Sequence, residues 1–129
     1  MRILFLTLLI GFIFTSDLRA ETRITTDRLY QLCSIDETGA ERVQDGHVSC
    51  QSYIIGVLDY YQTLKALDAV TGVNFCLPDN VSDFDLQTIV LRYIGENARH
   101  KGFLAAPVVV LALQAQFPCV RSISKTALE

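Results

Sequence analysis

Residues 47–68, HVSCQSYIIGVLDYYQTLKALD, decide the fold, because they form the longest stretch of the chain with one regular pattern. Apolar and tyrosine side chains recur at steps of three and four residues, the period of one face of an α-helix. Gly56 lies inside the pattern, where glycine costs about 1 kcal/mol relative to alanine. It marks either a weak point or a close approach by another backbone. The stretch predicts a long amphipathic helix, whose apolar face holds Cys50, Tyr53, Ile54, Val57, Leu58, Tyr61 and Leu64.

Three shorter helices are predicted, one before this stretch and two after it. Residues 25–34 begin with threonines that can cap a helix. Residues 82–94 begin with Ser82, which can form a capping box with an acidic side chain three residues later. Residues 104–117 are apolar nearly all round, which indicates a buried central helix, and Pro107 suggests that its regular part begins a few residues after 104. No segment reads convincingly as a strand. The expected fold is therefore all-α, a small four-helix domain, orthogonal or bundle-like, with two disulfides.

The first twenty residues have the layout of a secretory signal peptide. Arg2 precedes an apolar run from Ile3 to Phe14, and a short polar region ends at Ala20. The run is shorter than the roughly 20 apolar residues that span a bilayer. We therefore expect residues 1–20 to be removed and residues 21–129 to form one helical domain, periplasmic or secreted, with no membrane partner after cleavage.

The predicted mature domain is acidic. Without residues 1–20 it keeps nine of the 11 basic and 13 of the 14 acidic residues, a net charge of −4. Nucleic acid prefers a basic face, so no nucleic-acid partner is expected. An acidic surface instead suits a basic protein partner.

All four cysteines lie in the predicted mature part, and an even number in a small exported chain is typical of disulfides. Cys33 and Cys50 flank an acidic loop, and a bond between them would hold the two ends of that loop. Cys76 and Cys119 both lie near a proline outside the helices, and a bond between them would fasten the chain after the last helix. The sequence favours these two pairs, Cys33–Cys50 and Cys76–Cys119, and leaves the crossed pairings open.

Residue patterns for chemistry are missing from the sequence. It holds no nucleophile elbow, no zinc-protease motif and no glycine-rich phosphate loop. Its two histidines are far apart, and no cysteine pair has the close spacing of a structural zinc site. We expect no catalytic residue, no metal and no cofactor, and hence no enzyme.

Three groups of residues are candidates for contact surfaces instead. The first is the acidic loop between the first two helices, which could enter a basic groove; its acids are Asp36, Glu37, Glu41 and Asp45. The second is the stretch before and into the third helix, with Asp79, Asp83 and Asp85. The third is a set of apolar residues outside the core stripes that could form a homodimer face: Ile55, Phe84 and Leu91.

The order of four short motifs resembles a known family. They are the lone Cys33, a Cys-x-x-Tyr-x-x-Gly motif that begins at Cys50, Phe-Cys-Leu-Pro at 75–78, and Phe-Pro-Cys at 117–119. This pattern is similar to the Rap/Tai family of immunity proteins of type VI secretion, over roughly residues 29–119. One difference is that the family commonly has His-Pro between its third and fourth helices, where this chain has NARHKG at 97–102.

The resemblance implies an exported, all-helical, disulfide-bonded domain that is often a homodimer. It implies that the protein binds and neutralises a toxic effector, in the best-understood case a peptidoglycan-cleaving amidase, by inserting a protruding loop into the active-site cleft. The alternative function is a periplasmic stress chaperone or an assembly accessory protein on the same scaffold.

Overall fold

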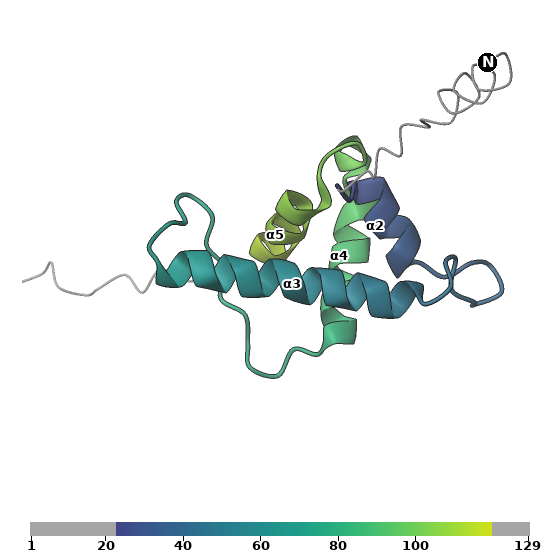
Figure 1. Ribbon diagram of the computed structural model, residues 1–129, viewed down its shortest axis with the longest axis horizontal. Coiled ribbons are helices and arrows are strands. Elements are labelled where there is room, and N and C mark those ends of the chain that lie inside the picture. The colour runs from purple at the N-terminus through teal and green to yellow at the C-terminus, as the bar shows by residue number, and fades with distance from the viewer. Residues whose placement is uncertain (1–22, 120–129) are drawn as a thin grey trace, which may run out of the picture.

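The computed structural model describes residues 23–119, which form four α-helices and one 3₁₀ turn (Figure 1). The elements are α2 (Thr26–Cys33), α3 (Gly46–Ala66), α4 (Asp83–Glu96), η1 (Ala98–His100) and α5 (Ala105–Gln116). Within these residues, β-type pairing of the backbone is limited to three isolated bridges, and no strand is formed. The predicted all-α class with four helices and two disulfides is therefore confirmed. The predicted leader, residues 1–20, lies outside the described residues.

The helices begin where local chemistry can satisfy their first amides. Thr25 accepts a hydrogen bond from the Arg28 amide at the start of α2. Ser82 and Asp85 form the predicted capping box at the start of α4, each side chain bonding the backbone amide of the other residue. A helix over about 104–117 was predicted and α5 is found there, but the later start expected for its regular part was wrong, because the helix already begins at Ala105 and keeps Pro107 in its first turn. A proline there removes only an amide that has no partner within the helix.

Two glycines in α3 have different roles. A Cβ atom on Gly46 would lie 2.6 Å from the backbone oxygen of Leu32, so the start of α3 can approach α2 only with glycine at this position. Asp45, the residue before it, has a φ of 56°, which turns the chain sharply into the helix. Gly56 has no atom within 4 Å of the Cβ position, so the close backbone approach considered for it does not occur within the described part.

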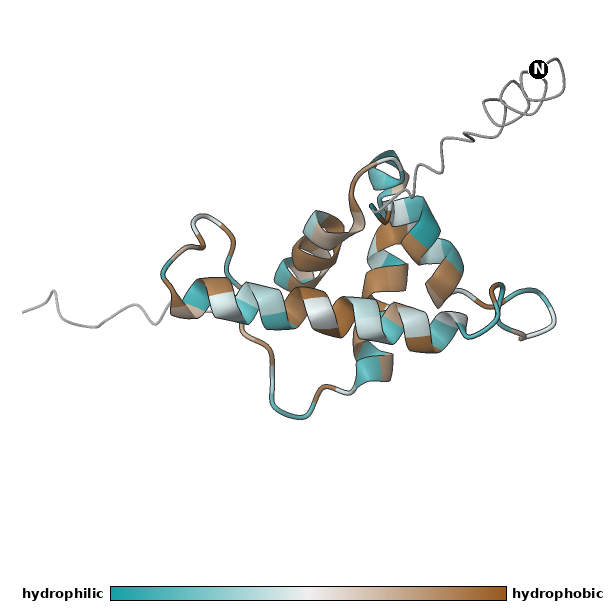
Figure 2. Ribbon diagram, viewed as in Figure 1, coloured by the Kyte–Doolittle hydropathy of each residue, from teal (hydrophilic) through white to brown (hydrophobic). Residues whose placement is uncertain are grey.

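One core lies where the four helices meet, and each helix contacts the other three. In Figure 2, α4 passes behind α3, and α5, with its strongly hydrophobic segments, lies above α3 in the view and beside α4. The predicted central position of α5 agrees with its burial. The buried apolar residues are Leu29, Cys33, Cys50, Ile54, Leu58, Tyr61, Phe75, Leu86, Val90, Ile94, Ala105, Val108, Val109, Ala112 and Leu113.

A buried glutamine joins three helices through its side-chain amide. Gln87 on α4 is only 2% exposed, and its Nε2 donates to the Cys33 carbonyl at the end of α2 over 2.8 Å. Its Oε1 accepts from Gln51 Nε2 on α3 over 2.9 Å. A buried amide is costly unless it is bonded, so this network fixes how the ends of α2 and α3 meet α4.

Both disulfides follow the uncrossed pairing. Cys33–Cys50 joins the end of α2 to the first turns of α3 inside the core. Cys76–Cys119 joins the linker before α4 to the chain after α5, next to a hydrogen bond of 2.9 Å from the Cys76 amide to the Phe117 carbonyl. The ring of Phe75 stacks on Tyr61 of α3, with centroids 4.4 Å apart. The linker is thus fastened to both α3 and the chain end.

Candidate functional site

The loop between α2 and α3, residues 34–45, projects from one end of α3 (Figure 1). The Cys33–Cys50 disulfide cross-links its base: it joins the last residue of α2 to the second turn of α3, five residues past the end of the loop, with the two Cα atoms 5.1 Å apart. Inside the loop, Ile35 and Glu41 form a bridge, and the Asp36 amide donates to the Ala40 carbonyl over 2.7 Å. The loop is therefore a tight hairpin-like structure on a cross-linked base.

The Asp36 carboxylate organises the tip of this loop. Its Oδ1 accepts hydrogen bonds from the Thr38 hydroxyl at 2.6 Å, the Thr38 amide at 2.8 Å and the Ala40 amide at 3.1 Å. These bonds favour the ionised form and lower the pKa of Asp36, with the Thr38 hydroxyl as the largest cause. Through Oδ1 the side chain holds the loop together, so a substitution here would disturb the loop itself as well as any contact with a partner.

The lowered pKa of Asp36 predicts how the loop responds to acid. Because the folded pKa lies below the unfolded one, the carboxylate stabilises the loop above its ordinary pKa, and this is lost as pH falls through the folded value. A nuclear magnetic resonance titration of the Asp36 carboxyl should give a midpoint below about 3.9. The Thr38 and Ala40 amide signals should shift with the same midpoint and should not titrate in Asp36→Asn. A midpoint at or above the ordinary value would contradict this account of the loop.

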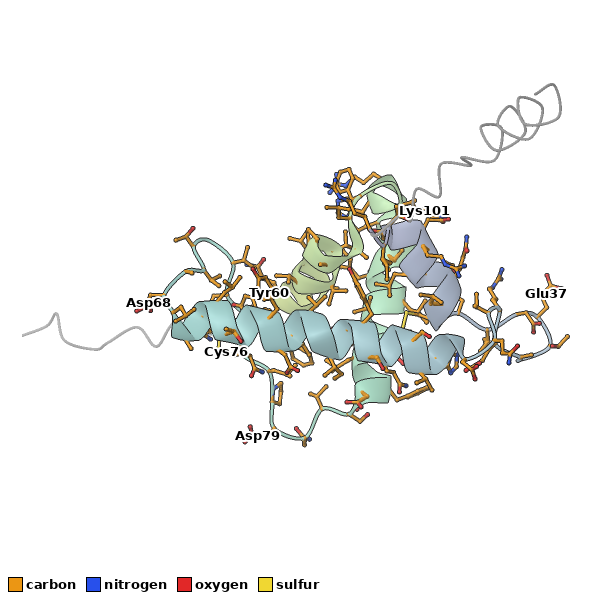
Figure 3. The ribbon with its side chains drawn as sticks, viewed as in Figure 1. Glu37, Tyr60, Asp68, Cys76, Asp79 and Lys101 are labelled. Atoms are coloured by element: carbon orange, nitrogen blue, oxygen red, sulfur yellow. A yellow bond between two sulfur atoms is a disulfide. The ribbon has the colours of Figure 1, made fainter. Side chains whose placement is uncertain are left out.

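The other three acids of the loop differ in how free they are. Glu41 is used internally, because its Oε1 accepts from the His47 amide at 3.2 Å and lies 3.8 Å from His47 Nδ1. Glu37 is exposed at the tip and has no hydrogen bond or ion pair to another described residue (Figure 3). The Asp45 side chain is exposed and makes no capping bond to α3. Glu37 and Asp45 are thus the carboxylates that the loop presents outward.

The second predicted acidic group is split in the same way. Asp85 belongs to the capping box of α4. Its pKa is lowered by hydrogen bonds from Ser82, most by the one from the Ser82 hydroxyl and less by the one from the Ser82 amide. Asp79 lies exposed in the linker before α4 (Figure 3). Asp83 is exposed at the first position of α4. Only Asp79 and Asp83 are therefore available to a partner.

A shallow groove between α3 and the start of α4 brings two of the predicted groups together. It contains Asp83 of the second acidic group and Ile55 of the predicted dimer face. Phe84, next to Asp83, is 63% exposed, whereas Leu91 is half-buried on α4. The homodimer predicted through these residues stays a prediction. The remaining residues of the groove are Val48, Gln51, Ser52, Gly56 and Asp59.

Most residues of this groove were not predicted as a surface, although the sequence contains a signal for it. Val48, Ser52, Ile55 and Asp59 follow one another at steps of four, three and four residues, so they share one side of α3. A second helical face, opposite the core stripe, could have been recognised from that spacing.

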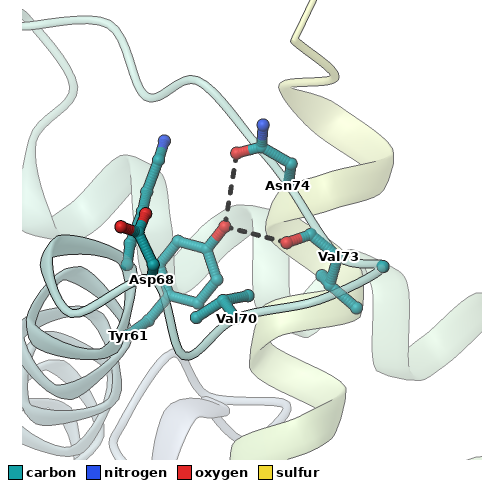
Figure 4. Close-up of a pocket in the computed structure, with 7 residues that line it drawn as sticks. Tyr61, Asp68, Val70, Val73 and Asn74 are labelled. Atoms are coloured by element: carbon teal, nitrogen blue, oxygen red, sulfur yellow. Dashed lines mark hydrogen bonds between the residues drawn. The ribbon is translucent and has the colours of Figure 1, made fainter.

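A recess at the other end of α3 lies between the helix and the following linker (Figure 4). Tyr61 forms its wall and donates its hydroxyl to the Val73 carbonyl over 3.1 Å. The Asn74 side-chain oxygen lies 3.5 Å from the same hydroxyl, and Lys65 and Asp68 line the rim. Tyr61 thus fastens the linker to α3. Among residues 23–119 there is no cluster of metal-binding side chains and no helix long and apolar enough to cross a membrane.

The sequence of this helical domain matches the model of a known protein family. The sequence model of the Rap1a immunity proteins matches residues 25–119, from the cap of α2 to the last cysteine. The chain belongs to the Rap1a immunity protein family. Membership implies that it neutralises a cognate effector of type VI secretion, and members are typically inhibitors without catalysis. No curated protein and no solved structure matches the chain.

Proposed function

We propose that this Rap1a-family chain is a periplasmic antidote that binds a peptidoglycan-cleaving amidase and blocks its active-site cleft with the loop of residues 34–45. The observation that carries the proposal is the cross-linked, internally bonded loop that projects from the helical body with Glu37 free at its tip. The family match supports an effector as the partner. The two disulfides support an oxidising compartment such as the periplasm.

The order within the loop favours binding by insertion. A flexible segment loses conformational freedom when it enters a cleft, and that loss weakens affinity. Here the disulfide, the Ile35–Glu41 bridge and the Asp36 bonds have already restricted the loop before it meets a partner. The outward carboxylates can then steer it to a basic cleft and pair with cations there.

Asp79 and Asp83 provide a second contact in this proposal. Both are exposed and carry no hydrogen bond or ion pair within residues 23–119. Asp83 lines the groove between α3 and the start of α4, and Asp79 lies in the linker that leads into α4. An effector seated on the loop could therefore also meet these carboxylates, which would extend the acidic surface along α3.

The decisive experiment measures binding of the Glu37→Lys variant to the cognate effector, identified by pull-down of the mature protein from periplasm followed by mass spectrometry. Reversing one charge at the inserted tip should weaken binding at least about tenfold in calorimetry, and amidase inhibition should weaken in parallel. Glu96→Lys is the matched control, because Glu96 is also exposed but ends α4 at the opposite end from Asp83. Its affinity should stay within about twofold of the unchanged protein.

Equal affinities for Glu37→Lys, Glu96→Lys and the unchanged protein would remove the loop from the interface. A loss with Asp79→Lys alone would assign the contact to the second acidic group instead. The predicted alternative, a stress chaperone, would protect many unfolded proteins and would not depend on a single carboxylate at the loop tip.

A further inference from the structure

Basic side chains gather at one corner of the molecule, away from the acidic loop. Backbone hydrogen bonds bring the start of α2 against the turn before α5: the Thr26 amide donates to the Phe103 carbonyl over 2.8 Å, and the Asp27 amide to the Lys101 carbonyl over 3.0 Å. The Ala105 amide donates back to the Ile24 carbonyl over 2.9 Å. We call this region the basic corner, and its exposed side chains are Arg23, Arg28, Arg99, Lys101, Phe103 and Leu104.

The charge of this corner contrasts with the rest of the domain. None of its four cations forms an ion pair with another described residue. The nearby acids are Asp27, whose carboxylate accepts from the Gln31 amide, and Glu96, at the end of α4. The acidic loop and the start of α4 together carry seven acids and a single cation, Arg42. The domain is therefore electrically polarised in spite of its net negative charge, as the separation of Lys101 from Glu37 and Asp79 illustrates (Figure 3).

Two large apolar side chains stand beside these cations. Phe103 is 55% exposed and Leu104 is 47% exposed. Cations next to an exposed aromatic and an aliphatic side chain suit the interface of a bilayer, where the apolar groups enter the headgroup region and the cations meet lipid phosphates. Phe103 keeps this exposure although its ring also stacks on His100, with centroids 5.2 Å apart.

The position of the corner along the chain points to the same occupant. The apolar run Ile3–Phe14 ends nine residues before Arg23 of the basic corner in the sequence. At the roughly 3.3–3.6 Å per residue of an extended chain, the corner stays within about 30 Å of that run. Until residues 1–20 are removed, a chain whose apolar run lies in a bilayer would therefore hold this corner, rather than the acidic loop, near the lipid surface.

We propose that the basic corner docks on the surface of an anionic phospholipid bilayer, which leaves the acidic loop facing outward. This peripheral contact goes beyond effector neutralisation. It also differs from the sequence expectation of no membrane partner after cleavage. Each cation near an anionic surface contributes a modest attraction, so the contact should be weak, reversible and sensitive to salt.

The test is co-sedimentation of the protein purified from the periplasm, with its N-terminus determined by mass spectrometry, with lipid vesicles. The protein should sediment with vesicles that contain phosphatidylglycerol at low salt, and not with pure phosphatidylcholine vesicles. Lys101→Glu should lower the bound fraction at least about fivefold. Lys65→Glu, the same change at an exposed lysine in the last turn of α3, should leave it unchanged. Phe103→Ser should weaken binding without changing its dependence on salt.

Circular dichroism and thiol titration of each variant separate loss of binding from loss of fold. No sedimentation with anionic vesicles would overturn the proposal, and so would equal losses for Lys101→Glu and Lys65→Glu. Binding to an acidic protein that survives Phe103→Ser, without binding to vesicles, would assign the corner to a protein partner instead. Effector affinity measured on the same variants tests the proposed function separately, because the corner contributes no residue to the loop.

Discussion

Replacing Cys76 and Cys119 together with alanine is expected to lower the free energy of unfolding by about 4 kcal/mol. The bond closes a separation of 43 residues, and cross-links of that span restrict the unfolded chain by this amount in the chain-entropy account. A domain of this size has a total stability of roughly 5–15 kcal/mol, so much of it depends on one bond. Urea unfolding followed by circular dichroism measures the change.

The other disulfide gives a control, because its removal should lower both the stability and the effector affinity. Cys33–Cys50 spans 17 residues, so its replacement by alanines should cost about 3 kcal/mol by the same account. Only this bond holds the base of the acidic loop. Effector affinity should therefore fall in the Cys33→Ala/Cys50→Ala variant and persist in the Cys76→Ala/Cys119→Ala variant wherever both are folded. A stability loss below about 1 kcal/mol for the Cys76–Cys119 pair would contradict its assigned role.

The sequence predicted the helices well because their signals are local. The period of residues 47–68 anticipated α3, which ends at Ala66, and the capping box at Ser82 anticipated the first turn of α4. What it could not predict depends on contacts between distant segments. Gln87 is polar and falls beside the apolar stripe of α4, yet it is buried because the Cys33 carbonyl and Gln51 come together around it.

His100 and Phe75 show the same limit. His100 lies in a polar segment of the sequence between two charged residues, yet it is buried and stacked between Tyr93 and Phe103. Phe75 lies in a linker by sequence and joins the core only because Tyr61 offers a ring to stack on. In both cases a residue in irregular chain is buried by a partner that no periodic pattern reveals.

The sequence indicated where the acidic loop lies, but not which of its acids hold the loop together and which face outward. The four acids of the loop looked equivalent in the sequence, because each is a carboxylate in a polar segment. The structure separates them: Asp36 and Glu41 maintain the loop, whereas Glu37 and Asp45 face outward. That division depends on which amides the backbone turns towards each carboxylate, and it decides which substitutions test binding rather than folding.

Leu113→Ala should have the next largest effect on stability, a loss of about 3 kcal/mol. Leu113 is fully buried on α5, which packs against all three other helices as each of them does, so its truncation leaves a cavity that the surrounding helices cannot easily fill. For a domain of this size the melting temperature should fall by roughly 15 °C. The matched control is Leu67→Ala, because Leu67 is 71% exposed just after α3 and should change stability by less than about 0.5 kcal/mol.

The comparison tests whether α5 is the centre of the fold rather than only its most apolar segment. An apolar helix on the outside of a domain could be truncated at Leu113 at little cost, because water or mobile side chains would take up the space. A buried helix in contact with three neighbours has no such freedom, since interiors are close-packed and relax only in part. Similar small losses for Leu113→Ala and Leu67→Ala would place α5 at the periphery. The Cys76–Cys119 bond would then fasten the chain end to a surface helix, and the large stability loss expected on its removal would need another cause.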